Sequence, residues 1–285
     1  MKQKIALIGA AGKMGSRITD NLMKESCYEL LVCEKGEVGI RKLKEKGLKP
    51  LSTENAAKIA DIIIMAVPDT VLGEVVEGIL PLLKKNATIV VLDPAAPYAG
   101  EIPIRKDITY VATHPCHPSL FREQKTSEAK RDFFGGVAAV QDIVIALIHG
   151  SEENFEKAKK LCCAMFSPVE KCYRVTLKQM ALLEPALSEV IGATSTIILK
   201  EAVEVAASYG IPKEVAKSFI LGHISTELAI AFGIIDADFS DACKVAIELG
   251  KKWVFQPEWQ KVFKEEMIKK AIDLMLHPEK QIRKE

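Results

Sequence analysis

The sequence predicts an α/β fold in which a doubly wound parallel sheet is followed by an all-helical C-terminal domain. In the first half of the 285 residues, short unbroken apolar runs alternate with segments of helical period, which is typical of parallel strands buried on both faces. After Val175 no strand-like run appears, and apolar residues recur at helical spacing. We therefore expect two domains, residues 1–175 and 176–285, joined by a long interdomain helix.

The elements of the first domain follow from these alternating patterns. Apolar runs predict strands at residues 5–8, 30–34, 62–67, 88–92 and 108–112, with residues 137–140 and 143–148 as further strands or strand edges. Helical period predicts helices at residues 14–24, 41–46, 71–83 and 151–166. Ser151 is expected to cap the last of these helices, because two glutamates follow it in the first turn.

The second domain is expected to be helical throughout. The predicted helices cover residues 176–208, 213–232, 240–249 and 258–276. Gly210 and Pro212 end the first of them and start the second. A helix from 176 to 208 would be about 50 Å long at a rise of 1.5 Å per residue. It would protrude from a small domain unless another surface packed along it, so we expect a homodimer.

The composition is that of a globular protein without a polyanionic partner. Hydrophobic residues make up 48% of the chain, charged residues 27%, and the formal net charge is +1. The first apolar segment is too short for a signal peptide, and no uncharged apolar run approaches the roughly 18 residues that span a bilayer. We expect a cytoplasmic protein that binds neither nucleic acid nor membrane.

A glycine-rich loop lies between the first predicted strand and the first predicted helix. Its sequence is Gly9-Ala10-Ala11-Gly12-Lys13-Met14-Gly15. Such a loop turns tightly and lets backbone N–H groups approach a pyrophosphate at the helix N-terminus, as in Rossmann dinucleotide-binding domains. The residues expected to bind the cofactor here are Gly9, Ala11, Gly12, Lys13, Met14 and Gly15. A purely structural turn is the alternative.

Two further segments fit a bound dinucleotide. Glu34 ends the second predicted strand, where a carboxylate accepts the ribose hydroxyls and repels a 2′-phosphate, so NAD is expected rather than NADP. Lys35 and Arg41 are close in sequence and leave NADP open as the alternative. Val67 and Pro68 follow a buried strand at the edge where the nicotinamide half should lie.

Three residues are candidates for the chemistry. His114 follows a strand at the same carboxyl edge, within Thr113-His114-Pro115-Cys116-His117-Pro118, and is suited to acid–base work or to metal binding. Glu184 lies in an apolar stretch before Pro185, where a kink would turn its carboxylate toward the cleft. His223 is four residues before Glu227 and shares a helical face with it. The alternatives are a loop histidine with local hydrogen bonds for His114, a helix-surface carboxylate for Glu184 and a satisfied core histidine for His223.

These motifs, taken together, resemble known dehydrogenases. Gly12-Lys13-Met14-Gly15, Ala66-Val67-Pro68-Asp69 and the long following helix are similar to the 6-phosphogluconate/3-hydroxyacid dehydrogenase superfamily. The sequence departs from its Lys-x-x-x-Asn pattern, because Leu182 lies four residues after Lys178. The more specific motifs resemble the D-apionate oxidoisomerase group, whose chemistry is related to that of ketol-acid reductoisomerases. They are His114-Pro115-Cys116-His117-Pro118, Leu183-Glu184-Pro185-Ala186, Gly222-His223 and Phe239-Ser240-Asp241.

The resemblance implies NAD-linked oxidation of a hydroxy or branched sugar acid, coupled to an acyl or carboxylate shift. It also implies a divalent metal, with His114 and Glu184 as the ligands carried over. An imidazole and a carboxylate suit zinc or a similar ion better than calcium. Two alternatives stay open: a metal-free 3-hydroxyacid or prephenate-type dehydrogenase with His114 as acid–base, and a non-catalytic NAD(H)-sensing protein.

Overall fold

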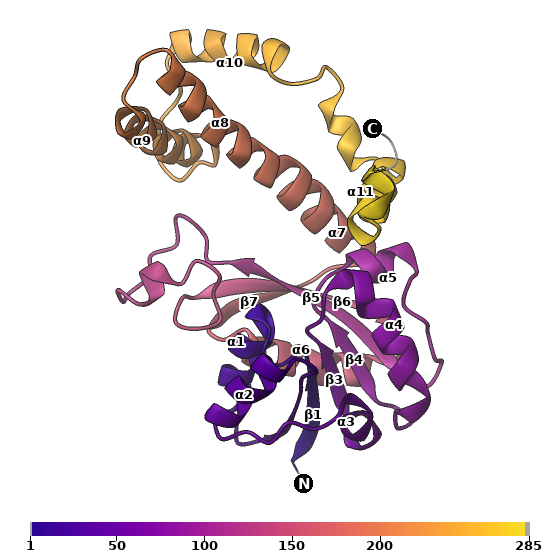
Figure 1. The fold of residues 1–285 in the computed structure, drawn as a ribbon. Helices are drawn as coiled ribbons and strands as arrows, with labels where there is room; N and C mark the ends of the chain where they lie inside the picture. The colour runs from indigo at the N-terminus through magenta and orange to yellow at the C-terminus, as the bar shows by residue number, and fades with distance from the viewer. Residues whose placement is uncertain (1, 283–285) are drawn as a thin grey trace. The chain divides into compact units, whose positions relative to one another are not determined.

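A computed structural model describes residues 2–282 and confirms the predicted fold class (Figure 1). The strands are β1 (Gln3–Ile8), β2 (Tyr28–Cys33), β3 (Ile62–Met65), β4 (Thr88–Val91), β5 (Thr109–His117), β6 (Gln141–His149) and β7 (Val169–Arg174). They form one sheet in the order β2-β1-β3-β4-β5-β6-β7. Strands β1 to β5 pair in parallel, β6 is antiparallel to β5, and β7 is parallel to β6. The carboxyl ends of the first five strands therefore meet at one edge of the sheet.

Helices cover both faces of this sheet. The helices of the N-terminal part are α1 (Lys13–Leu22), α2 (Glu37–Glu45), α3 (Thr53–Ile59), α4 (Asp69–Ile79), α5 (Ala95–Ala99), α6 (Glu152–Met165) and α7 (Leu177–Ala181), with 3-10 turns at Leu80–Leu82 and Ala129–Arg131. Figure 1 shows α1 and α2 on one side of the strands and α4 and α5 on the other. On the first side, alternate strand residues such as Leu7 and Ile64 pack with Ile18 of α1 and Phe155 of α6 in one buried cluster.

Several local predictions were wrong, each for a physical reason. Residues 137–140 form no strand, because the N–H groups of three of them donate to the Asp132 carboxylate instead of a neighbouring strand. The sequence analysis also missed α3, α5 and β7. Strand β7 has only half-buried and exposed positions, so it lacks the apolar run that marks the inner strands.

The chain divides into two compact units, each of which is described by itself. Of the described residues, the first contains 2–184 and 269–282, and the second contains 185–268. The sequence analysis expected a boundary near Val175 instead. Helix α7 belongs to the first unit because Met180 and Ala181 are fully buried and the helix packs against α5 and β6. The C-terminal segment also belongs to the first unit, where Ile272 and Leu276 are buried and His277 Nε2 lies 2.9 Å from Glu101 Oε1.

The predicted long helix is continuous from Leu177 to Ser208 but not regular. Between α7 and α8 (Thr194–Ser208), residues Leu182–Ala193 form a π-helix that contains Pro185. Proline cannot donate the usual backbone hydrogen bond, and a widened turn accommodates that loss. The remaining elements are α9 (Lys213–Ala231), α10 (Asp241–Trp253), a 3-10 turn at Trp259–Phe263, α11 (Glu265–Leu276) and α12 (Glu279–Ile282).

The second unit buries little of its own apolar surface. Among the residues the structure describes, α8 and α10 contain no buried residue, and α9 contains only Ala229. The helix Leu177–Ser208 is long and apolar enough to cross a membrane by length and composition, with a mean hydropathy of 1.4 over its most apolar window. Other residues of the second unit therefore leave the apolar face of this helix largely exposed.

Candidate active site

The glycine loop makes the close approach that a dinucleotide site requires. Gly9 has a φ of +81°, and a Cβ there would lie 2.2 Å from the carbonyl oxygen of Ala66. A Cβ on Gly15 would lie 2.0 Å from the carbonyl oxygen of Gly9. Only glycine therefore fits at these two positions, and the N-terminus of α1 is packed directly against the end of β1.

Glu34 lies at the end of β2 beside this loop. One of its carboxylate oxygens accepts the N–H of Ala11 at 3.1 Å, and the other accepts the N–H of Lys35 at 2.9 Å. Gly39 makes room for the side chain, because a Cβ there would lie 2.5 Å from Glu34 Cγ. The carboxylate is thus fixed next to the glycine loop, and its role toward a ribose stays a prediction.

Two hollows flank the turn formed by Val67 and Pro68. One, of about 220 Å³, is lined by Gly9, Glu34 and Thr53 together with Val67 and Pro68. The other, of about 350 Å³, is lined by Gly12, Lys13, Met14, the same turn and Asp93. The two hollows have the positions expected for the adenosine and nicotinamide halves of a dinucleotide at the carboxyl edge of a doubly wound sheet.

Three metal-ligating side chains meet beside the second hollow. Asp93 follows β4, His114 lies on β5, and Glu184 lies in the first turn of the π-helix. One ligand atom from each of them lies within 4.8 Å of the others. His114 Nε2 is 3.4 Å from Glu184 Oε2, and His114 Nδ1 is 3.8 Å from Asp93 Oδ2. The structure thus brings His114 and Glu184 together and adds Asp93.

The hydrogen bonds fix the state of the imidazole. His114 Nδ1 lies 2.9 Å from the carbonyl oxygen of Leu92, so this nitrogen carries the proton and donates it. The other ring nitrogen, Nε2, then faces the Glu184 carboxyl. Burial, with Asp93 as a second cause, raises the pKa of Glu184 to about 7. One imidazole nitrogen and two carboxyl groups facing one another in this way suit a shared proton or a bound cation.

Asp93 is the site residue that the sequence analysis missed. It stands directly after a buried strand, which is the signal that led to Glu34. Asp93 Oδ1 accepts the N–H of Ala95 at 2.8 Å and so supports the start of α5. An acid that follows a buried parallel strand at the carboxyl edge was therefore a detectable sign of this site.

A long loop between β5 and β6 brings an aromatic ring to the glycine loop. His117 Nδ1 donates to the carbonyl oxygen of Phe134 at 2.9 Å, and the rings of His117 and Phe134 meet edge to face at 6.1 Å. Burial lowers the pKa of His117 below its ordinary value. On the other side, Lys13 Nζ lies 3.6 Å from the centre of the Phe134 ring. Phe134 therefore connects the end of β5 with the first residue of α1.

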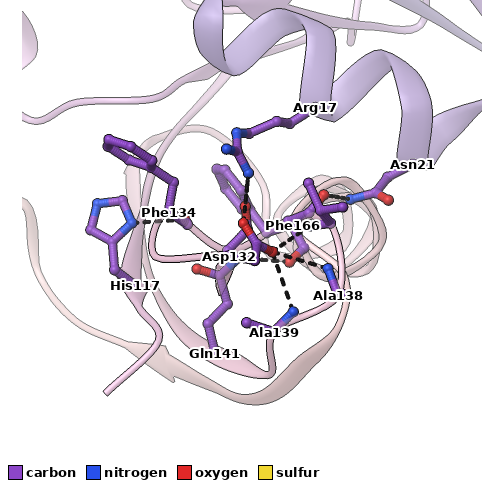
Figure 2. Close-up of polar contacts among 12 residues, drawn as sticks. Arg17, Asn21, His117, Asp132, Phe134, Ala138, Ala139, Gln141 and Phe166 are labelled. Carbon is purple, nitrogen blue, oxygen red and sulfur yellow. Dashed lines mark hydrogen bonds and ion pairs between the residues drawn. The ribbon is translucent and has the colours of Figure 1, made fainter. Parts of the chain in front are cut away.

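Asp132 holds this loop in place (Figure 2). Its Oδ1 accepts from Arg17 of α1 at 2.9 Å. Its Oδ2 accepts the N–H groups of Val137, Ala138 and Ala139 at 2.9, 3.0 and 3.2 Å. Burial alone would raise the pKa of Asp132, but these donors outweigh it and hold the pKa below its usual value. The loop is thereby fixed to the helix that follows the pyrophosphate-binding turn.

His223 lies on α9 in the second unit, and the structure does not place it with the other candidates. It is exposed, and its Nδ1 donates to the carbonyl oxygen of Phe219 at 2.9 Å. The two rings stack with their centres 4.0 Å apart. The alternative weighed for it, a histidine in the core, does not fit an exposed side chain, and its contacts in the structure are with Phe219 on the same helix.

Comparison with known proteins agrees with this architecture. Residues 1–130 match the NADPH-binding domain of acetohydroxy acid isomeroreductase. Residues 122–276 match the C-terminal domain of decarboxylating phosphogluconate dehydrogenase. The fold and these matches define a dinucleotide-dependent oxidoreductase, which confirms the class predicted from the sequence.

Similarity over the full chain narrows this class. The D-apionate oxidoisomerase of Cupriavidus necator is 45% identical over 273 residues, which are 95% of this chain and 99% of that enzyme. The enzyme of the same description from Blautia hydrogenotrophica is 42% identical over 279 residues and covers 97% of each chain. A crystal structure from Cupriavidus necator, described as a semialdehyde dehydrogenase NAD-binding protein in complex with calcium and NAD, is 44% identical. It has a TM-score of 0.94 and covers 96% of this chain and 100% of that one. The chain belongs to the D-apionate oxidoisomerase family.

Proposed function

We propose that this chain oxidises D-apionate or a closely related branched sugar acid with NAD⁺ and couples the oxidation to an isomerisation. The observation that carries the proposal is the convergence of Asp93, His114 and Glu184 beside the hollow at the nicotinamide end. Curated relatives at 42% and 45% identity, matched over nearly their whole length, bear the corresponding name. A secondary alcohol bound there would lose a hydride to NAD⁺ and its hydroxyl proton to a base, giving a carbonyl, NADH and H⁺.

NAD⁺ is the expected cofactor, although one matching family is named for NADPH. The carboxylate of Glu34 is oriented by Ala11 N–H and Lys35 N–H next to the first hollow. Such a carboxylate accepts hydrogen bonds from ribose hydroxyls and repels the charge of a 2′-phosphate. The similar structure from Cupriavidus necator contains NAD.

The residues beside the second hollow also fit a divalent cation. Asp93, His114 and Glu184 offer two carboxylates and a neutral imidazole nitrogen, and the tautomer of His114 is set by its bond to the Leu92 carbonyl. When bound, such a cation supplies Lewis-acid chemistry at the substrate hydroxyl and the neighbouring carbonyl. With two carboxylates, the donor set also accepts harder ions than the zinc that the sequence suggested, and the similar structure holds calcium.

A second candidate is a metal-free dehydrogenase. It is favoured by one observation, the position of His114 Nε2 3.4 Å from the Glu184 carboxyl while Nδ1 is bound to the Leu92 carbonyl. In this mechanism Nε2 takes the hydroxyl proton while the hydride leaves, and the carboxylate of Glu184 stabilises the resulting imidazolium.

A substrate screen separates these candidates. NADH formation is measured with D-apionate and with linear and branched sugar acids, before and after exhaustive chelation, and the product skeleton is determined by NMR. Oxidation of D-apionate with a rearranged skeleton that stops on chelation and returns with zinc, calcium or magnesium supports the main proposal. Activity that survives chelation favours the metal-free dehydrogenase. No oxidation of any acid with either cofactor overturns both and favours an NAD(H)-sensing protein.

We also propose that the chain forms a homodimer through its second unit. Helices α8 and α9 enclose two apolar hollows of about 380 and 500 Å³, and exposed apolar side chains such as Ile197 and Phe219 lie on the same helices. A second copy would cover this surface. Light scattering should give twice the chain mass of 31.3 kDa, and vesicle flotation tests the alternative that a lipid surface covers it. A monomer that does not bind vesicles contradicts both.

His223 and the cytoplasmic location stay predictions. His223→Asn should lower turnover without changing NAD⁺ affinity if His223 takes part in the reaction. Unchanged turnover would leave His223 with the local role that its contacts to Phe219 describe.

A further inference from the structure

We infer that the side chain of Lys13 binds the carboxylate of the acid substrate, and so determines that the enzyme acts on an acid. The inference rests on the proposed function, because it assigns a subsite for the substrate of that reaction. The sequence analysis assigned Lys13 to the cofactor only as part of the glycine loop.

The ammonium of Lys13 contacts the loop between β5 and β6. It lies 3.6 Å from the centre of the Phe134 ring, in a cation–π contact. The Arg17 guanidinium approaches the same ring, at 5.5 Å from its centre. Phe134 is itself fixed, since its carbonyl accepts from His117 and its loop is bound to α1 through Asp132 (Figure 2). The position of the ammonium is therefore determined by the β5–β6 loop.

The same side chain lines the hollow that contains Asp93. Lys13 is the one cationic residue among those that line this hollow, whereas Asp69 and Asp93 are acidic. The hollow is the one assigned above to the nicotinamide end, so a substrate next to it would lie against the reacting ring. A sugar acid whose hydroxyl lies near Asp93 would need a positive group for its carboxylate, and Lys13 is the group present.

The diphosphate does not require this lysine. The N–H groups at the start of α1, together with the helix dipole, form an anion site by themselves. An ammonium on a ring face keeps its remaining N–H groups free for a further acceptor. A single carboxylate is an acceptor that such a point charge can bind.

The test compares a charged substrate with a neutral one. D-Apionate and its primary amide differ in charge at one end only. In Lys13→Met, KM for the acid should rise about 10- to 100-fold, as for loss of a hydrogen bond to a charged group. KM for the amide and the Kd for NAD⁺ should stay within about twofold of wild type. Lys13→Arg should recover part of the loss. Phe134→Leu should raise KM for the acid by a smaller factor, because the ammonium remains but loses its cation–π contact with the ring.

Lys157→Met is the matched control, since Lys157 pairs with Glu153 on the surface of α6 and should change neither constant. An equal loss for acid and amide, or a weakened NAD⁺ affinity alone, overturns the inference. If wild type oxidises no sugar acid, the proposed function fails by itself. Binding of D-apionate to the NADH complex is then measured by calorimetry. Binding that is lost in Lys13→Met still supports the subsite, and binding that is unchanged by the substitution overturns it.

Discussion

The most direct test of the site architecture is the substitution Asp132→Asn. The side chain of Asp132 is 5% exposed, and its carboxylate accepts from Arg17 and from three consecutive backbone N–H groups. The amide of asparagine keeps the size of the side chain but loses the charge and offers an N–H₂ group where an acceptor is needed. Some of the four donors are then left without a partner.

The expected cost can be bounded from these contacts. Breaking a buried ion pair by removing one partner costs about 3–5 kcal/mol. The Arg17 side chain is 24% exposed, so its charge regains some hydration. The asparagine oxygen also keeps part of the backbone bonding. We therefore expect the free energy of unfolding to fall by about 2–4 kcal/mol at neutral pH.

The loss should depend on pH in a defined direction. The pKa of Asp132 is lowered in the folded protein, so the folded state favours the ionised carboxylate. Its stabilisation is complete above the unfolded pKa of about 3.9 and is lost as the pH falls through the lower folded pKa. The difference between wild type and Asp132→Asn should therefore be constant from about pH 7 to pH 5 and shrink below about pH 4.

Urea unfolding followed by circular dichroism, together with hydrogen exchange of the amides at residues 137–139, measures both effects. A local loss of about 2 kcal/mol accelerates exchange of these amides roughly 30-fold. Asp20→Asn is the control, because Asp20 pairs with Lys46 on the surface and should change stability by less than about 1 kcal/mol. A variant within about 0.5 kcal/mol of wild type, or a deficit that persists unchanged at low pH, would refute the reasoning.

Two further substitutions test other parts of the site, and a third tests a pair of thiols between α6 and β7. Glu34→Ala should weaken NAD⁺ binding about tenfold and relax discrimination against NADP⁺; an unchanged ratio of the two dissociation constants would remove Glu34 from the cofactor site. Glu184→Gln should reduce turnover by a factor of at least about 10² with NAD⁺ affinity intact, and near-normal turnover would leave Glu184 without a chemical role. A hydrogen bond from Cys172 lowers the pKa of Cys163 to about 7, so iodoacetamide labelling of Cys163, followed by peptide mass spectrometry, should rise through neutral pH. In Cys172→Ala the midpoint should move to higher pH, and a midpoint that stays in place would show that the hydrogen bond is not its cause.

The inner part of the fold was predictable because its signals are local. Strands such as β3 and β4 are buried at every position and appear in the sequence as unbroken apolar runs. Strand β7 was missed, since an edge strand with half-exposed positions has no such run. Residues 137–140 are apolar yet not a strand, because the partner of their N–H groups is a side chain and not another strand.

Of the candidate site, only the residues that lie close together in the sequence could be predicted as a group. The glycine loop and Glu34 belong to one short β-α-β segment, and their positions follow from spacing alone. Asp93, His114 and Glu184 are separated by tens of residues and meet only once the sheet order and the packing of α7 are known. The contact between Lys13 and Phe134 depends on a loop without periodicity, whose course is determined by Asp132. No pattern in the sequence predicts that contact.

The return of the chain to its first unit has a consequence for dissecting the protein. Residues 269–282 complete the N-terminal unit, with Ile272 and Leu276 buried and His277 bound to Glu101. A fragment that stops at Glu184 would expose the apolar surface which these side chains cover. An isolated nucleotide-binding module should therefore be built by replacing residues 185–268 with a short linker, so that the C-terminal helix is retained.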